Sequence, residues 1–132
     1  RGRGHGGLLR LARGSLEAAG KQCQRKGDAM PYAIVLRDAP GSAAPRREHL
    51  QRHLEFVERV IDRILVAGPL SDPASGAQTG SLYVLDVADA EAARALLEQD
   101  PYYAAGVWDD VTIEPFAAAA GTWVGGLAWQ RR

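Results

Sequence analysis

The sequence predicts an α+β fold with the element order β-α-β-β-α-β, the ferredoxin-like arrangement of a four-stranded antiparallel sheet with two helices on one face. Three observations lead to this prediction. Short segments at 32–37, 81–87 and 108–116 combine alternating and β-branched apolar residues, which is typical of strands. Residues 46–66 carry apolar residues three and four positions apart, as in a helix packed on one side. Residues 90–99 are a second, Ala-rich helical segment.

The first strand and the first helix are separated by a loop-like stretch. Residues 38–45 (DAPGSAAP) are rich in turn-forming residues. Pro45 suits the start of the helix expected over 46–66. Gly68 and Pro69 then end this helix and begin a short extended segment. The apolar face of the helix consists of Leu50, Leu54, Val57, Ile61, Ile64 and Leu65.

The second half repeats the pattern of strand, helix and strand. Residues 71–79 are polar and turn-rich, and SLYVLDV at 81–87 follows as a strand. Asp89 is a suitable N-cap for the second helix. Pro101 biases the residue before it away from helical geometry, so the helix is expected to stop there. The strand over 108–116 completes the unit.

The charges divide the chain into two parts. Residues 1–29 contain seven Arg or Lys and two acidic residues, whereas residues 30–132 contain nine Arg and 14 acidic residues. We interpret 1–29 as a basic, Gly- and Arg-rich extension outside the folded domain, such as one translated from a misplaced start. A targeting or partner-binding arm is the alternative. The domain is then expected over 30–117, followed by a tail over 118–132.

Apolar side chains are expected on both sides of the strands, and about 100 residues cannot add a third layer. We therefore expect a second copy to cover the open sheet face, giving a homodimer. Trp123 and Trp129 of the tail could then lie over the partner subunit. The residues counted for the two sides are Tyr32, Val35, Tyr83, Leu85, Val111 and Ile113.

Composition excludes several classes of function. The part from residue 30 onward is acidic and contains no lysine, which argues against nucleic-acid binding. The apolar runs are too short and too interrupted for a membrane span or signal peptide. The single cysteine excludes an intrachain disulfide and fits a reducing compartment, so we expect a cytoplasmic protein. No phosphate-binding loop, dinucleotide fingerprint or nucleophile elbow is present.

Two histidines and one aspartate are the candidates for chemistry. His49 and His53 are four residues apart on one helix face, but a zinc site would need further ligands. His49 in the first helical turn could act as a general base, or it could be an ordinary helix-start residue. Asp100 is an acid at a helix end, which the helix dipole disfavours, so a partner elsewhere would explain it. The alternative for Asp100 is a turn cap before Pro101.

Together these stretches resemble the YciI-like (YCII-related) family. The resemblance rests on RREHLQRHLEF, AGPL, GSLYVLDV and DPYYAAGVWDDVTIEPF, whose order and spacing match from Met30 to about Phe116. The most specific part is D-P-Y-x-x-A-G-V followed by a strand that ends in Pro-Phe. The resemblance implies a ferredoxin-like unit that forms a dimeric αβ barrel, with a pocket between sheet and helices.

The resemblance also implies a site. The family's histidine in its H-L motif matches His49, the aspartate of its D-P-Y motif matches Asp100, and the small residue of its G-S motif matches Ser81. Relatives with assigned chemistry perform acid–base reactions on small cyclic compounds, such as dehydrochlorination of a hydroxylated aromatic. The muconolactone isomerases share the barrel.

We therefore expect a small enzyme without cofactor or metal, of a lyase or isomerase type. His49 would act as general base or acid, oriented by Asp100, in an elimination or isomerisation of a small cyclic or aromatic compound. Arg46 or Arg47 would neutralise an anionic ring substrate, and Ser81 would hydrogen-bond to it. The alternative is a non-catalytic small-ligand-binding or accessory module of the same fold.

Overall fold

The structure is a computed structural model that describes residues 30–130 of the 132-residue chain. The predicted basic extension, residues 1–29, lies outside the described residues. Residues up to Phe116 form one compact unit, and the segment from Ala117 belongs to another. The functional features described below all lie in the first of these units.

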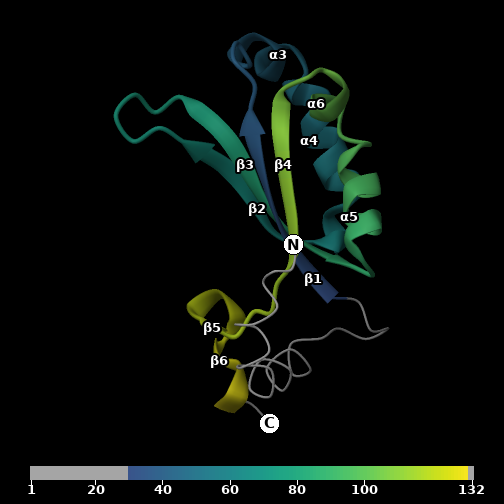
Figure 1. Cartoon of the computed structure of the whole chain (residues 1–132), viewed down its shortest axis with the longest axis vertical. Coiled ribbons are helices and arrows are strands. Elements are labelled where there is room, and N and C mark those ends of the chain that lie inside the picture. The colour runs from purple at the N-terminus through teal and green to yellow at the C-terminus, as the bar shows by residue number, and fades with distance from the viewer. Residues whose placement is uncertain (1–29, 131–132) are drawn as a thin grey trace. The chain divides into compact units, whose positions relative to one another are not determined.

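Four strands form one antiparallel sheet in the order β2-β3-β1-β4, which confirms the predicted fold class. The helices lie on one face of this sheet (Figure 1). The strands are β1 (Met30–Asp38), β2 (Ile64–Ser71), β3 (Gln78–Val87) and β4 (Trp108–Pro115). The helices are α3 (Ala43–Glu48), α4 (Leu50–Arg59), α5 (Ala90–Leu97) and α6 (Pro101–Ala104), with a 3-10 turn over Ile61–Arg63.

The stretch predicted as one helix over 46–66 contains the end of α3, all of α4, the 3-10 turn and the start of β2. His49, with φ −106° and ψ 11°, is the boundary between α3 and α4. The chain leaves the helix after Arg59, and Ile64 pairs with Leu85 in the sheet. The run ILVA favours a strand because its β-branched residues pack well on a pleated surface, and this preference overrides the helical spacing of the apolar residues.

The core lies between the helices and one face of the sheet. The register places Ile34 opposite both Tyr83 and Ile113, so these side chains share the helix-facing side. Leu36 in the same way lies opposite Ser81 and Val111. Strand alternation therefore carries Ser81 and Tyr83 to the side on which α4 lies. The buried core consists of Ile34, Leu36, Phe56, Tyr83, Leu85, Val87, Ala93, Leu96, Leu97, Tyr102, Val107 and Trp108.

The opposite face of the sheet is not covered by any other element of residues 30–116 (Figure 1). The register places Val35 and Leu82 opposite one another on this face, and Leu82 is 36% exposed. Of the six residues counted from the sequence for the two sides, five lie on the helix-facing side and only Val35 lies here. The predicted homodimer contact at this face stays a prediction.

The tail has its own short elements. β5 (Ala120–Gly121) pairs with β6 (Gly126–Leu127), with 3-10 turns over Thr122–Val124 and Ala128–Gln130. Trp123 is 86% exposed and Trp129 is 54% exposed. Their predicted placement over a partner subunit stays a prediction. No helix within residues 30–130 is long and apolar enough to cross a membrane.

Candidate functional site

Asp100 lies in the short connection between α5 and α6. Its backbone is extended (φ −72°, ψ 129°), as expected for a residue that precedes proline. Pro101 occupies the first turn of α6, and the carboxylate accepts the backbone N–H of Tyr102 at 2.9 Å. Asp100 is therefore the N-cap of a new helix, where its charge is favourable, and not an acid opposed to a helix dipole. Only 1% of Asp100 is exposed.

The buried carboxylate of Asp100 also forms a hydrogen bond with a histidine. Nδ1 of His53 lies 2.9 Å from Oδ2 and 3.0 Å from Oδ1 of Asp100. The imidazole stacks on the ring of Tyr102, with centroids 4.0 Å apart and planes 8° from parallel. Because an ionised carboxylate can only accept, we assign the hydrogen to Nδ1, which leaves the lone pair on Nε2. No residue of 30–130 is hydrogen-bonded to that Nε2.

The predicted hydrogen bond between His49 and Asp100 is not formed. Nδ1 of His49 instead contacts the guanidinium of Arg52, and its Nε2 lies 4.0 Å from Glu48. His49 is the boundary residue between α3 and α4, although i→i−4 hydrogen bonds from His49 to Pro45 and from His53 to His49 continue across it. His53, one turn further along, takes the position beside Asp100.

Arg46 lines the site from α3, and its charge is balanced there. Nε and Nη2 bind the two carboxylate oxygens of Asp38 at 2.8 and 2.9 Å. Nη2 also donates to the carbonyl of Gly80 at 3.1 Å and to Oγ of Ser81 at 3.3 Å. The hydrogen bond to Asp38 raises the pKa of Arg46, against the opposing effect of burial. Arg46 therefore links α3 to β1 and β3. Its predicted contact with substrate stays a prediction.

The Gly80-Ser81 pair has two structural requirements. A Cβ at position 80 would lie 2.3 Å from the carbonyl oxygen of Leu36, so only glycine fits between β3 and β1. Ser81 is 7% exposed and its hydroxyl accepts from Arg46. The structure thus places Ser81 at the wall of the site, beside Arg46, and its predicted contact with a ligand stays a prediction.

Tyr83 and Tyr102 were not predicted as site residues. The hydroxyl of Tyr83 donates to Oδ2 of Asp100 at 3.3 Å, and burial, followed by the charge of Asp100, raises the pKa of Tyr83. The hydroxyl of Tyr102 donates to the backbone carbonyl of Arg46 at 3.1 Å, and burial likewise raises its pKa. The position of Tyr83 had a sequence signal, since it alternates with Ser81 along one strand and so shares its face.

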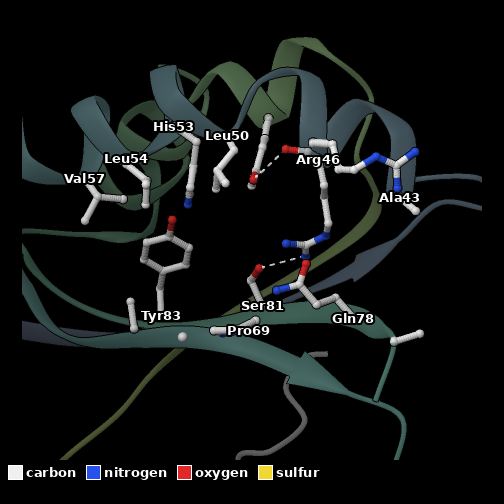
Figure 2. Close-up of a pocket in the computed structure, with 15 residues that line it drawn as sticks. Ala43, Arg46, Leu50, His53, Leu54, Val57, Pro69, Gln78, Ser81 and Tyr83 are labelled. Atoms are coloured by element: carbon white, nitrogen blue, oxygen red, sulfur yellow. Dashed lines mark hydrogen bonds between the residues drawn. The ribbon is translucent and has the colours of Figure 1, made fainter. Parts of the chain in front are cut away.

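These residues surround an open pocket of about 530 Å³ between the helices and β2-β3. That volume lies within the range of ordinary small-ligand sites. Figure 2 shows His53 and Tyr83 pointing toward one another across it. The described residues contain no group of three or more His, Cys, Asp or Glu side chains that could hold a metal ion. The pocket is lined by Ala43, Arg46, Arg47, Leu50, His53, Leu54, Val57, Ala67, Gly68, Pro69, Ala77, Gln78, Ser81, Tyr83 and Tyr102.

Comparison with known families identifies the domain. The sequence profile of the YCII-related domain matches residues 30–117. The chain belongs to the YCII-related family. Protein YciI of Escherichia coli O6:H1 is 35% identical over 94 residues, which are 66% of this chain and 96% of that protein. An uncharacterised protein of Haemophilus influenzae is 32% identical over 94 residues, again 66% of this chain and 96% of that protein. The YciI-like resemblance seen in the sequence is thus confirmed.

A solved structure resembles this YCII-related domain closely enough to compare folds. It is the 5-chloro-2-hydroxyhydroquinone dehydrochlorinase TftG of Burkholderia phenoliruptrix, in complex with 2,5-dihydroxybenzoquinone. The TM-score is 0.63 and the sequences are 26% identical, over 70% of this chain and 97% of that one. The YCII-related fold thus occurs in a protein described as a dehydrochlorinase.

A signal for His53 was present in the sequence of this YCII-related chain. His53 is followed by Phe56, Val57 and Val60, which lie three, four and seven positions further on and so share its helix face. All three pack in or against the core. The stripe first assigned to the core instead contains Leu50 and Leu54, each 47% exposed. Had the stripe that contains His53 been taken as the core-facing side of the helix, His53 would have been predicted to point toward the sheet.

Proposed function

We propose that this YCII-related protein is a small enzyme that uses His53 and Asp100 for acid–base chemistry on a small cyclic or aromatic compound. The observation that supports it is the hydrogen bond between the buried Asp100 and His53, at the wall of a pocket of ligand size. A buried carboxylate that holds one imidazole nitrogen fixes the tautomer and presents the other nitrogen as a base. This geometry favours catalysis over a purely structural role for the pair.

In the proposed reaction, Nε2 of His53 takes a proton from a saturated ring carbon next to a carbonyl carbon, which a hydroxylated aromatic compound offers in its keto tautomer. The C–H electron pair forms a ring double bond, and the charge moves either to a departing group on the neighbouring saturated carbon or to the carbonyl oxygen. Loss of the departing group is an elimination, and return of the proton to another carbon is an isomerisation. Asp100 stabilises the imidazolium that forms in either case. The raised pKa of Tyr83 keeps its hydroxyl protonated as a donor in the same pocket.

The two histidines provide a matched test of this proposal. 5-Chloro-2-hydroxyhydroquinone, to which the name of the similar TftG refers, is a suitable first substrate, with chloride release and deuterium incorporation as assays. His53→Ala should lower turnover by about 10²- to 10⁴-fold, because general base catalysis contributes that much. His49→Ala should retain turnover, because His49 contacts Arg52 and not Asp100. Circular dichroism controls for folding in both variants. Full turnover by His53→Ala would contradict the proposed catalytic role of His53.

A non-catalytic ligand-binding module is the competing function, and the pocket alone would serve it equally well. The two functions differ in whether the protein converts its ligand, using the hydrogen-bonded pair of His53 and Asp100, or only binds it. If ring compounds bind with micromolar affinity and His53→Ala changes only that affinity, with no chloride release or deuterium incorporation in the parent protein, the binding module is the better description.

We also propose that a second copy of the chain covers the open sheet face, which carries Val35, Leu82 and Val84. Sedimentation velocity at micromolar concentration should give a dimer, and Leu82→Asp should shift it toward monomer. A monomeric parent protein would contradict this arrangement. The single Cys and the composition support a cytoplasmic location, which fractionation of cells that express the protein would test.

A further inference from the structure

The pocket has two chemically different ends. Leu54 and Val57 of α4 lie at one end, and Ala43 and Gln78 lie toward the other (Figure 2). His53 and Tyr83 face one another nearer the apolar end, and Arg46 and Ser81 lie nearer the polar end (Figure 2). A ligand that fills the pocket therefore meets apolar surface, then the acid–base pair, then polar groups.

The charged side chains that line the pocket are all positive, apart from the titratable His53 and tyrosines. The lining residues include Arg46 and Arg47 and no Asp or Glu. Asp100 and Asp38, the two acids that bind lining residues, are hydrogen-bonded to His53 and to Arg46. Arg46 is thus already compensated, which leaves the charge of Arg47 as the one without a balancing carboxylate.

Arg47 itself is placed to use that charge. Its side chain is exposed and lines the pocket, and it makes no hydrogen bond or ion pair with any residue of 30–130. The positions one helical turn before it on α3 are Ala43 and Ala44, and Leu50 and Gln51 follow on α4; none of the four carries a charge. Glu48, its neighbour in sequence, lies 4.0 Å from His49 and is not a lining residue. Arginine suits this task because its guanidinium fork matches a carboxylate or similar planar anion.

We infer that the ligand of this pocket is a small ring compound with an acidic substituent, bound so that Arg47 pairs with the anion while the apolar edge of the ring lies against Leu54 and Val57. The reacting ring carbon then lies beside His53, and this last part rests on the proposed acid–base function. Arg47 and His53 lie on opposite sides of the helix break at His49. The acidic group and the reacting carbon are therefore held by different helices, at different ends of the ligand.

Matched pairs of ring acids and their neutral amides test the inference directly. The probes are benzoate, 2,5-dihydroxybenzoate and cyclohexanecarboxylate, each beside its own carboxamide of nearly the same shape. Binding to the full chain is measured by thermal shift and calorimetry, since a ligand of the native state raises its melting temperature. At least one acid should bind about tenfold or more tightly than its amide, the factor expected for hydrogen bonds to a charged partner.

Variants assign the preference to Arg47. Arg47→Gln should remove the preference for the acid, and Arg47→Lys should retain part of it. Arg94→Gln is the matched control, because Arg94 is an exposed arginine on α5 that does not line the pocket. Equal affinity for acid and amide, a preference that survives Arg47→Gln, or no binding by any of the three acids would overturn the inference.

The outcomes separate this inference from the proposed function. If the acid preference depends on Arg47 but His53→Ala leaves turnover unchanged, the ligand class stands and the acid–base role of His53 fails. If His53→Ala abolishes turnover but Arg47→Gln leaves the preference unchanged, the catalytic proposal stands and the assignment of the anion to Arg47 fails.

Discussion

Replacement of Gly80 by alanine should destabilise the fold through a backbone clash. Gly80 lies on β3 opposite Arg37 of β1, in the middle of the sheet. A Cβ at this position would stand 2.3 Å from the carbonyl oxygen of Leu36 and 3.4 Å from Cδ1 of Leu70. The Leu36 carbonyl belongs to the strand backbone and cannot rotate away as a side chain would, so β1 or β3 must shift.

The size of the stability change follows from two destabilising effects and one stabilising effect. Forcing one extra carbon into a close-packed site costs about 1–3 kcal/mol. A Gly→Ala change offsets about 0.4–1 kcal/mol of this by restricting the unfolded chain. A shift of Gly80 also disturbs its carbonyl, which accepts from Arg46 at 3.1 Å, and a hydrogen bond to a charged group contributes about 1.5–3 kcal/mol. We expect a net loss of about 2–5 kcal/mol in the free energy of unfolding.

Urea denaturation followed by circular dichroism measures this loss, at one fixed protein concentration so that any self-association is constant. Gly68→Ala on β2 is the control, because no atom lies within 4 Å of its added Cβ. That variant should unfold within about 1 kcal/mol of the parent protein. If both variants lose the same free energy, the close approach of Leu36 to Gly80 is not what requires glycine here.

Three further predictions concern the residues around the pocket. Arg46→Met or Asp38→Asn alone should cost about 3–5 kcal/mol of unfolding free energy, because each leaves a buried partner unpaired, and the double variant should cost less than the sum. Additive losses would contradict a coupled pair. Asp100→Asn should shift His53 toward its other tautomer, read from the ring ¹⁵N signals, and lower turnover about 10²-fold or more, while the cap of α6 is retained; an unchanged tautomer would contradict the assignment. Because the folded pKa of Tyr83 is raised, its contribution to stability is complete below about pH 10, where an unfolded tyrosine titrates, and is lost as the pH rises above that value. Tyr83→Phe should therefore show a shallower alkaline loss of stability in denaturant titrations, and an identical slope would count against the buried hydroxyl.

Most of the sheet could be predicted from the sequence because alternation is a local signal. The strand segments at 32–37 and 81–87 fall within observed strands, and the segment at 108–116 matches β4 except for Phe116, one residue beyond its end. The boundary between α4 and β2 could not be found in this way, because Ile64 and Leu65 fit both a helical stripe and a strand. Their assignment depends on pairing with β3, a contact between distant parts of the chain that local spacing does not contain.

The candidate site was predicted in part, for a similar reason. Asp100 was identified because an acid before a proline at a helix end is unusual, and the structure explains it as both a cap and a partner of histidine. The two alternatives considered from sequence were therefore not exclusive. The choice of His49 over His53 rested on its expected place in the first helical turn and on the match to the family's H-L motif. That motif occurs twice here, at His49-Leu50 and at His53-Leu54, and the structure places the second histidine beside Asp100.

The stacking of His53 on Tyr102 limits how the imidazole can move. Its ring lies nearly parallel to the phenol at 4.0 Å, and Asp100 binds its Nδ1 from the N-cap of α6. The same Tyr102 is fixed at its other end by the carbonyl of Arg46. A swing of the imidazole would have to break the stack and both carboxylate contacts together. In the proposed reaction, the position of His53 Nε2 would therefore be set by the protein before any ligand binds, and the ligand proton would have to approach that fixed nitrogen.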